Sequence, residues 1–303
     1  MVSRERLLDL GATFAEWATT KRVRVFAQIL LLGGLVFVVL RVRTLWHGGN
    51  VELANISWGA IAGSVALAAA GTAAGGFIWL VILEALGLRT QRRWVNIFFQ
   101  SQLGKYIPGS IWQYAGRAAI ARVHGIPTRP VGVSLPIEFA ASAAAAGSMA
   151  AFLLGWWGAA VVALFAALLI GLERPARSHG RPAFAAVRAT LLYLPAWLLL
   201  GTSFWLCARG LVGVPADDFL TYVGAFAVAW LAGLLAVYAP GGLGVREAVL
   251  VALLSSRIGA ADALVVAAAS RLILIFVDVV LAGIATVALR RGSRTGLDVP
   301  DPA

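Results

Sequence analysis

Cysteine and histidine are scarce in this chain, which contains the single cysteine Cys207 and the three histidines His47, His124 and His179. One cysteine cannot form an internal disulfide or a cysteine-rich metal cluster. The histidines are far apart and lack ligand spacing, so we expect no metal site. The sequence also lacks a phosphate-loop motif, an Asp-x-Asp pair and a nucleophile elbow. We therefore assign no catalytic residues and expect no cofactor.

Charged residues are also few, at 13% of the 303 residues, whereas hydrophobic residues make up 60% and the mean hydropathy is +0.86. Long apolar runs of this kind are typical of membrane-spanning helices. The net charge is +11, but the basic residues fall between the apolar runs. That is the pattern of cytoplasmic loops, and no nucleic-acid partner is needed to explain it. The sequence predicts an all-α, multi-pass protein of a bacterial-type cell membrane.

The apolar runs predict a single transmembrane domain, residues 23–289, with about seven or eight membrane-spanning helices. The long spans are expected at 23–40, 58–83, 131–154, 157–172, 189–206, 219–237 and 264–289. Residues 1–22 are polar and lack a cleavage site, so we interpret them as a cytoplasmic N-terminal tail. Residues 290–303 are polar and contain prolines, and we expect a disordered C-terminal tail.

The distribution of charge predicts the sidedness of the loops. Arginine clusters at 89–93, 117–129, 174–188 and 290–294 favour the cytoplasmic side, whereas Asp217 and Asp218 indicate an external loop. Both termini are then cytoplasmic. This arrangement requires residues 244–257 to cross the membrane, although about 14 residues are few against the roughly 20 of a full span. A re-entrant path for this stretch is the alternative.

Two stretches, residues 94–125 and 238–257, are interrupted by Pro-Gly pairs. Proline breaks a helix and glycine permits a sharp turn. Such a break is tolerated at membrane depth only within protein or beside a wet cavity. Paired breaks in the two halves of a hydrophobic chain indicate a transporter's substrate site. We therefore predict re-entrant segments, with ordinary surface turns as the alternative.

The chemistry of both segments suits an anion. Each Pro-Gly turn opens a helix, whose N-terminus offers free backbone N–H groups and the positive end of a dipole. The predicted phosphate- or lipid-binding residues are Lys105, Tyr106, Pro108, Gly109, Ser110, Arg117, Tyr238, Pro240, Gly241, Gly242, Gly244, Arg246 and Glu247. The alternative is that Arg117 and Arg246 are anchors at the membrane interface.

Three further charges lie within the predicted spans: Glu138, Arg271 and Asp278. Charges inside a membrane are costly, so they face a cavity or pair with one another. Arg271 and Asp278 share one face of the last helix and can bracket a polar cavity. A structural pair between Glu138 and Arg271 is the alternative. A further hypothesis is that Glu138 or Asp278 couples transport to proton movement, and its only support is that these carboxylates lie within predicted spans.

Residues 104–112 (GKYIPGSIW) and 240–247 (PGGLGVRE) together resemble the transmembrane region of the lysylphosphatidylglycerol synthase family. Glu138 and the stretch 270–272 (SRL) also match the pattern of that family. Phe139 departs from it, because the family often has a basic residue at this position. The resemblance extends from about the first span to Leu289 and implies a flippase-like integral membrane protein. The aminoacyl-transferase domain of full-length synthases is missing from this sequence, so lysyl transfer is not expected.

Three functions follow from these features. The leading hypothesis is a transporter that moves an anionic phospholipid or a polyprenyl-phosphate-linked sugar between leaflets. The second is a membrane-embedded enzyme acting on a polyprenyl phosphate, with Glu247 as its acid or base. The third is a non-catalytic partner subunit of a glycosyltransferase or another envelope-biosynthesis enzyme. Membrane lipids are the expected partners in each case, and the sequence predicts no oligomeric state.

Overall fold

A computed structural model describes residues 55–107, 112–154, 182–236 and 239–294 of the chain. Within these ranges the chain forms helices joined by short turns, with no β-strand, as the sequence predicts. The predicted N-terminal tail and the predicted spans 23–40 and 157–172 lie outside the described residues. The predicted number of membrane-spanning helices therefore stays a prediction.

Five described helices are long and apolar enough to cross a membrane, by length and composition. They are α3 (Trp58–Ala85), α6 (Thr128–Leu154), α8 (Pro182–Val212), α9 (Phe219–Leu235) and α11 (Ala260–Arg294). Each contains or closely matches one of the predicted spans. Helix α11 continues beyond the predicted boundary at Leu289 and ends at Arg294.

The remaining helices are short and belong to the two interrupted stretches. The first stretch contains η2 (Arg92–Trp94), α4 (Val95–Gln102), η3 (Leu103–Tyr106) and α5 (Trp112–Val123). The second follows η4 (Ala216–Asp218) and α9, and contains η5 (Pro240–Gly242) and α10 (Val245–Ile258). In the first stretch the helices α4 and α5 are therefore separate, and in the second the turn at η5 separates α9 from α10.

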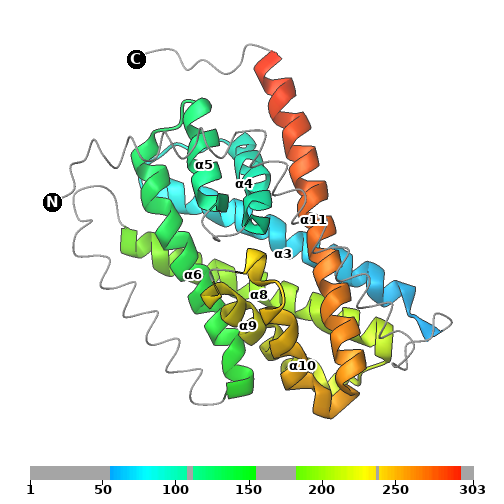
Figure 1. The fold of residues 1–303 in the computed structure, drawn as a ribbon. Coiled ribbons are helices and arrows are strands. Elements are labelled where there is room, and N and C mark those ends of the chain that lie inside the picture. The colour runs from blue at the N-terminus through cyan, green and yellow to red at the C-terminus, as the bar shows by residue number, and fades with distance from the viewer. Residues whose placement is uncertain (1–54, 108–111, 155–181, 237–238, 295–303) are drawn as a thin grey trace.

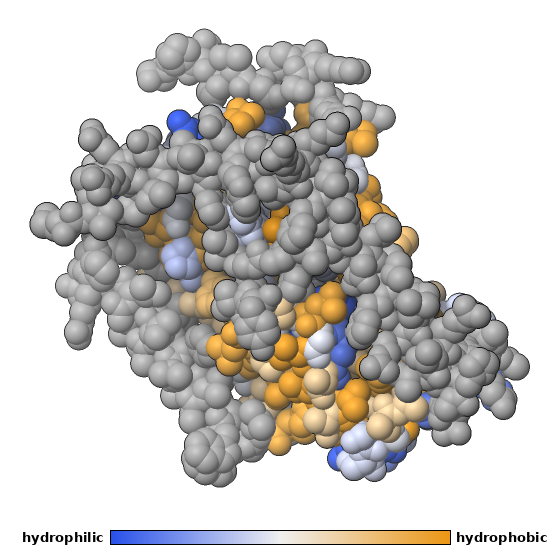
Figure 2. Space-filling model, viewed as in Figure 1, coloured by the Kyte–Doolittle hydropathy of each residue, from blue (hydrophilic) through white to orange (hydrophobic). Residues whose placement is uncertain are grey.

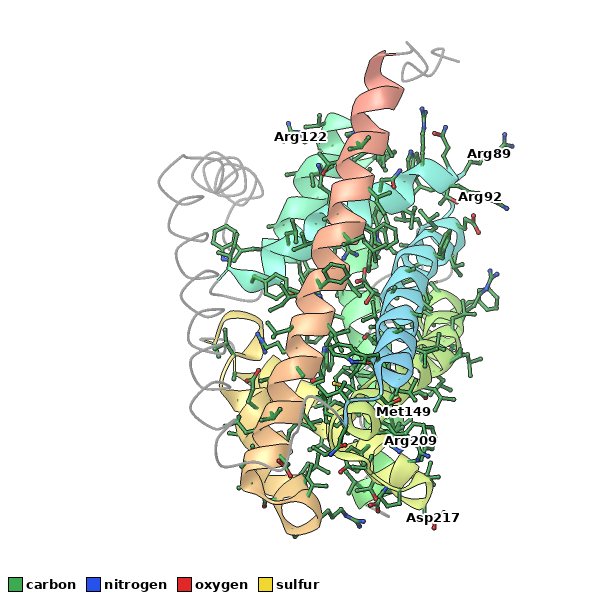
Figure 3. All side chains as sticks on the ribbon, turned by 90° about the vertical axis from the view of Figure 1, so that its right-hand side faces the viewer. Arg89, Arg92, Arg122, Met149, Arg209 and Asp217 are labelled. Carbon is green, nitrogen blue, oxygen red and sulfur yellow. The ribbon has the colours of Figure 1, made fainter. Side chains whose placement is uncertain are left out.

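The two ends of the molecule carry different charges. Arg89, Arg92 and Arg122 gather at one end, which we call the arginine end, whereas Asp217 lies at the opposite end, the aspartate end (Figure 3). Helix α11 runs between them and finishes at the arginine end (Figures 1 and 3). The arginines that the sequence assigns to one side of the membrane therefore lie together.

The two broken stretches enter from opposite ends. Arg92, before α4, and Arg122, in the last turn of α5, both lie at the arginine end (Figure 3). An ion pair between Arg257 of α10 and Asp218 ties the end of α10 to the start of α9 at the aspartate end. Helix α10 thus ends at the aspartate end, and the predicted crossing of the membrane by residues 244–257 stays a prediction. With 14 residues, α10 is not among the five helices long enough to span a membrane.

Small and polar residues hold α3 and α8 close together. A Cβ atom on Gly71 would lie 2.8 Å from Leu200 Cγ, so the helices can approach this closely only because Gly71 lacks a side chain. Ser64 and Ser203 also exchange hydrogen bonds, each hydroxyl donating to the other's backbone carbonyl at 2.7 and 2.8 Å. This contact gives the bundle a rigid wall beside the broken stretches.

The described surface is largely apolar. Hydrophobic residues cover much of its lower half in the space-filling view, and hydrophilic residues gather along the lower edge (Figure 2). Large side chains are exposed on α8 and α11, among them Leu191 at 61% and Ile284 at 61%. Exposed apolar faces of this extent are typical of proteins in contact with a membrane.

Candidate functional site

The tips of the two broken stretches, η3 and η5, contact each other in the middle of the fold. Gly241 lies at this contact, and its positive φ of 56° is a backbone conformation that favours glycine. The sequence places these segments about 135 residues apart. The fold brings them together at one place.

A cavity of about 190 Å³ lies at this meeting point. Its wall includes residues of α3, α4, α5, α6, α8, α9, α10 and α11 as well as both tips. The charged residues on the wall are Lys105, Glu138, Arg246 and Arg271. Aromatic residues, including Tyr114, Tyr193, Trp197 and Trp230, form much of the remainder. The cavity therefore combines charged side chains with aromatic rings.

Lys105 is already paired within the protein. Its Nζ lies 2.7 Å from an oxygen of Asp278, which is 2% exposed on α11. The Tyr106 hydroxyl donates to the same carboxylate at 2.5 Å. Asp278 therefore fastens η3 to α11 and neutralises Lys105, which remains 31% exposed. The predicted bracket of Arg271 and Asp278 forms only in part, because Arg271 lines the cavity while Asp278 binds η3.

Arg271 and Glu247 form a second pair that supports the other tip. Arg271 Nη1 donates to Glu247 Oε1 at 3.0 Å, and Nη2 donates to the Gly241 carbonyl at 3.2 Å. The other oxygen of Glu247 accepts a 2.7 Å hydrogen bond from the backbone N–H of Gly244. Glu247 therefore caps the first turn of α10. This helix N-terminus, predicted to bind a phosphate, already holds a carboxylate.

Arg117 and Glu138 form a third pair, and both residues are buried. The Arg117 guanidinium also lies 4.3 Å from the Phe98 ring centroid and donates from Nε to the Ser101 hydroxyl. Arg117 is 0% exposed, so it is not an anchor at the interface, and it does not line the cavity. The alternative pairing of Glu138 with Arg271 is wrong, because each of these residues binds another partner.

Arg246 differs from these cations. Among the described residues it forms no ion pair, and its buried Nε has no hydrogen-bond partner. Its guanidinium lies 5.8 Å from the Trp230 ring centroid. A Cβ on Gly233 would lie 2.6 Å from Arg246 Nε, so the Arg246 side chain lies against the backbone of α9. Arg246 is therefore a cation on the cavity wall that has no ion-pair partner among the described residues.

Several predicted site residues cannot be placed, since Pro108, Gly109, Ser110 and Tyr238 lie outside the described residues. Sequence reasoning also missed wall residues, notably Tyr114 of α5 and Trp230 and Gly233 of α9. Trp230 and Gly233 are three residues apart and share one face of α9, a spacing that could have indicated a common role. In the described part of the chain, no cluster of three or more His, Cys, Asp and Glu residues could hold a metal ion.

Comparison with models of known protein families and with curated proteins finds no match to this chain.

Proposed function

We propose that this protein is a flippase-like transporter of the cell membrane, which moves a lipid with an anionic head group between the two leaflets. The observation that carries the proposal is the central cavity, where Lys105, Arg246 and Arg271 lie on the wall beside the tips of both broken stretches. Cations in a cavity within an apolar bundle attract a phosphate, whereas an uncharged lipid needs none.

The arrangement of the two broken stretches supports transport. In our proposal α4, η3 and α5 form one hairpin and α9, η5 and α10 form the other, one entering from each side, so that their tips meet near the bilayer midplane. Transporters commonly bind substrate at such a position, between discontinuous helices. Movement of one hairpin relative to the other would open the cavity to one leaflet and close it to the other. The exposed apolar residues of α8 and α11 suit surrounding lipid.

The resemblance of residues 104–112 and 240–247 to the lysylphosphatidylglycerol synthase transmembrane region also favours a lipid substrate. The enzyme alternative is less well supported, because both oxygens of Glu247 are already bound, one by Arg271 and one by Gly244. A general acid or base needs a free position facing its substrate.

A leaflet-resolved assay tests the proposal. The purified protein is reconstituted into phosphatidylcholine vesicles that contain fluorescent phosphatidylglycerol, and a membrane-impermeant reductant bleaches the outer leaflet. We expect wild-type protein to make the inner-leaflet probe accessible faster than in empty vesicles. Arg246→Gln should slow this movement about ten-fold, the loss expected for one charge-assisted hydrogen bond.

The matched control is Arg122→Gln, which removes the same charge from an exposed position at the arginine end. It should leave lipid movement unchanged. Folded wild-type protein that accelerates no lipid probe would show that the proposed function is wrong.

A further inference from the structure

We propose that the central cavity selects a head group with a single negative charge, a phosphodiester, and that Arg246 is the residue that binds it. This inference rests on the proposed function and makes its substrate class specific. It follows from the balance of charges around the cavity.

Among the described residues, the charges that line the cavity or pair with a lining residue are four cations and three carboxylates: Lys105, Arg117, Arg246, Arg271, Glu138, Glu247 and Asp278. Each carboxylate binds one cation, so Asp278 neutralises Lys105, Glu138 neutralises Arg117 and Glu247 neutralises Arg271. Three pairs contribute no net charge. Counted over the described residues, the site therefore retains one positive charge, and Arg246 is the cation without an ion-pair partner.

Arg246 has a buried donor atom that the described protein leaves without a partner. Its Nε is buried without a hydrogen-bond partner, and the Trp230 ring lies beside its guanidinium. A buried donor without an acceptor is unfavourable, and an incoming anion can supply the acceptor. A guanidinium donates two parallel hydrogen bonds to the oxygens of a phosphate. Arg246 is therefore placed to bind a phosphate group directly.

The number of charges decides which phosphate fits. A phosphodiester carries one negative charge, whereas a phosphomonoester carries about 1.5 to 2 at neutral pH. In a low-dielectric cavity, each uncompensated charge weakens binding. One free cation therefore matches a phosphodiester, whereas a phosphomonoester leaves excess negative charge. A zwitterionic head group brings a cation of its own, which Arg246 repels.

The first experiment compares three fluorescent lipids in the vesicle assay: phosphatidylglycerol, a singly charged phosphodiester; phosphatidic acid, a phosphomonoester; and phosphatidylcholine, a zwitterion. We expect wild-type protein to move phosphatidylglycerol about ten-fold faster than either of the others. Equal acceleration of all three lipids would overturn the charge-matching inference while leaving lipid transport intact. No acceleration of any lipid would overturn the proposed function itself.

Two variants change the charge of the site in opposite directions. Arg246→Gln removes the free cation and should abolish the preference for phosphatidylglycerol over phosphatidylcholine, while Arg246→Lys should retain it. Asp278→Asn leaves Lys105 without its counter-ion and still accepts the hydrogen bond of Tyr106. The site then carries two positive charges, so the preference should shift towards phosphatidic acid. An unchanged preference in folded Asp278→Asn protein would contradict the inference.

Folding is checked by size-exclusion chromatography and thermal unfolding, with Arg122→Gln as the control that should keep wild-type selectivity. Competition then distinguishes the two sources of a phosphodiester. Unlabelled phosphatidylglycerol is added to one set of vesicles, and a polyprenyl phosphodiester of a single sugar to another. Inhibition by either lipid supports the inference and identifies the source. If unlabelled phosphatidic acid inhibited more strongly than either of these two lipids, the inferred preference for a phosphodiester would be wrong.

Discussion

At the scale of single residues, the role that the sequence suggests for Arg117 differs from the role that it has in the structure, where it pairs with Glu138. In the sequence, Arg117 follows a Pro-Gly turn and suggests a ligand contact or an interfacial anchor. In the fold its guanidinium is enclosed by Glu138, Ser101 and the ring of Phe98. A buried pair of this kind contributes little net stability compared with apolar residues, but the loss of one member leaves a buried charge.

We therefore predict that Arg117→Gln and Glu138→Gln each destabilise the protein by about 3–5 kcal/mol. The double variant Arg117→Met/Glu138→Met should recover most of that loss, because neither charge is then left alone. Thermal unfolding in detergent measures the three variants against Arg122→Gln, which changes an exposed arginine of the same helix. Additive destabilisation in the double variant would contradict the prediction.

At the scale of elements, the first broken stretch is held on two sides. Asp278 fastens η3 to α11 through Lys105 and Tyr106. Gly104 lets η3 lie directly against the start of α5, since a Cβ there would lie 2.6 Å from the backbone nitrogen of Gln113. Backbone cannot move aside as a flexible side chain does, so this contact requires glycine.

Gly104→Ala should consequently separate η3 from α5 and slow lipid movement in the vesicle assay by about ten-fold or more, through a loss of positioning. Gly116→Ala is the matched control within the same stretch, because a Cβ at Gly116 would have no neighbour within 4 Å. That substitution should keep wild-type activity and stabilise α5 by up to about 1 kcal/mol. Equal effects of the two substitutions would show that the close contact is unimportant.

At the scale of the whole molecule, the described residues form two hydrophobic clusters. One, with Trp79, Ile97 and Phe98, packs α3 against the first broken stretch. The other joins α3, α6, α8, α9, α10 and α11, and includes Trp197 and Phe226. The cavity has lining residues from both, Phe98 from the first and Trp197 from the second. Helix α3 contributes residues to both clusters, so it joins them across the cavity.

The charge difference between the two ends predicts sidedness. Single cysteines at Arg122 and Asp217, which are both exposed, should react with an impermeant thiol reagent from opposite sides of the membrane, with position 122 on the cytoplasmic side. The background is Cys207→Ala, which removes a buried thiol. Labelling of both positions from one side would show that the arginine and aspartate ends do not face different compartments.

Local signals in the sequence were sufficient for the class of the protein and for most of its helices. The apolar run from Trp58 needs no partner to identify a membrane-length helix, because the length of the run alone meets the requirement. The Pro-Gly pairs likewise predicted two breaks, since proline and glycine act on their own backbone. The cap on α10 was also predictable, because Glu247 follows Gly244 at the spacing of a capping box.

Tertiary structure decided which charges remain free. Lys105 and Arg246 are equivalent in the sequence, each a cation beside a Pro-Gly turn. Lys105 meets Asp278 on α11, whereas Arg246 meets no carboxylate among the described residues. The physical reason is that an ion pair depends on which helix faces pack together, and these helices are far apart along the chain. Spacing within one segment carries no information about that packing, so only the folded chain identifies Arg246 as the unbalanced cation.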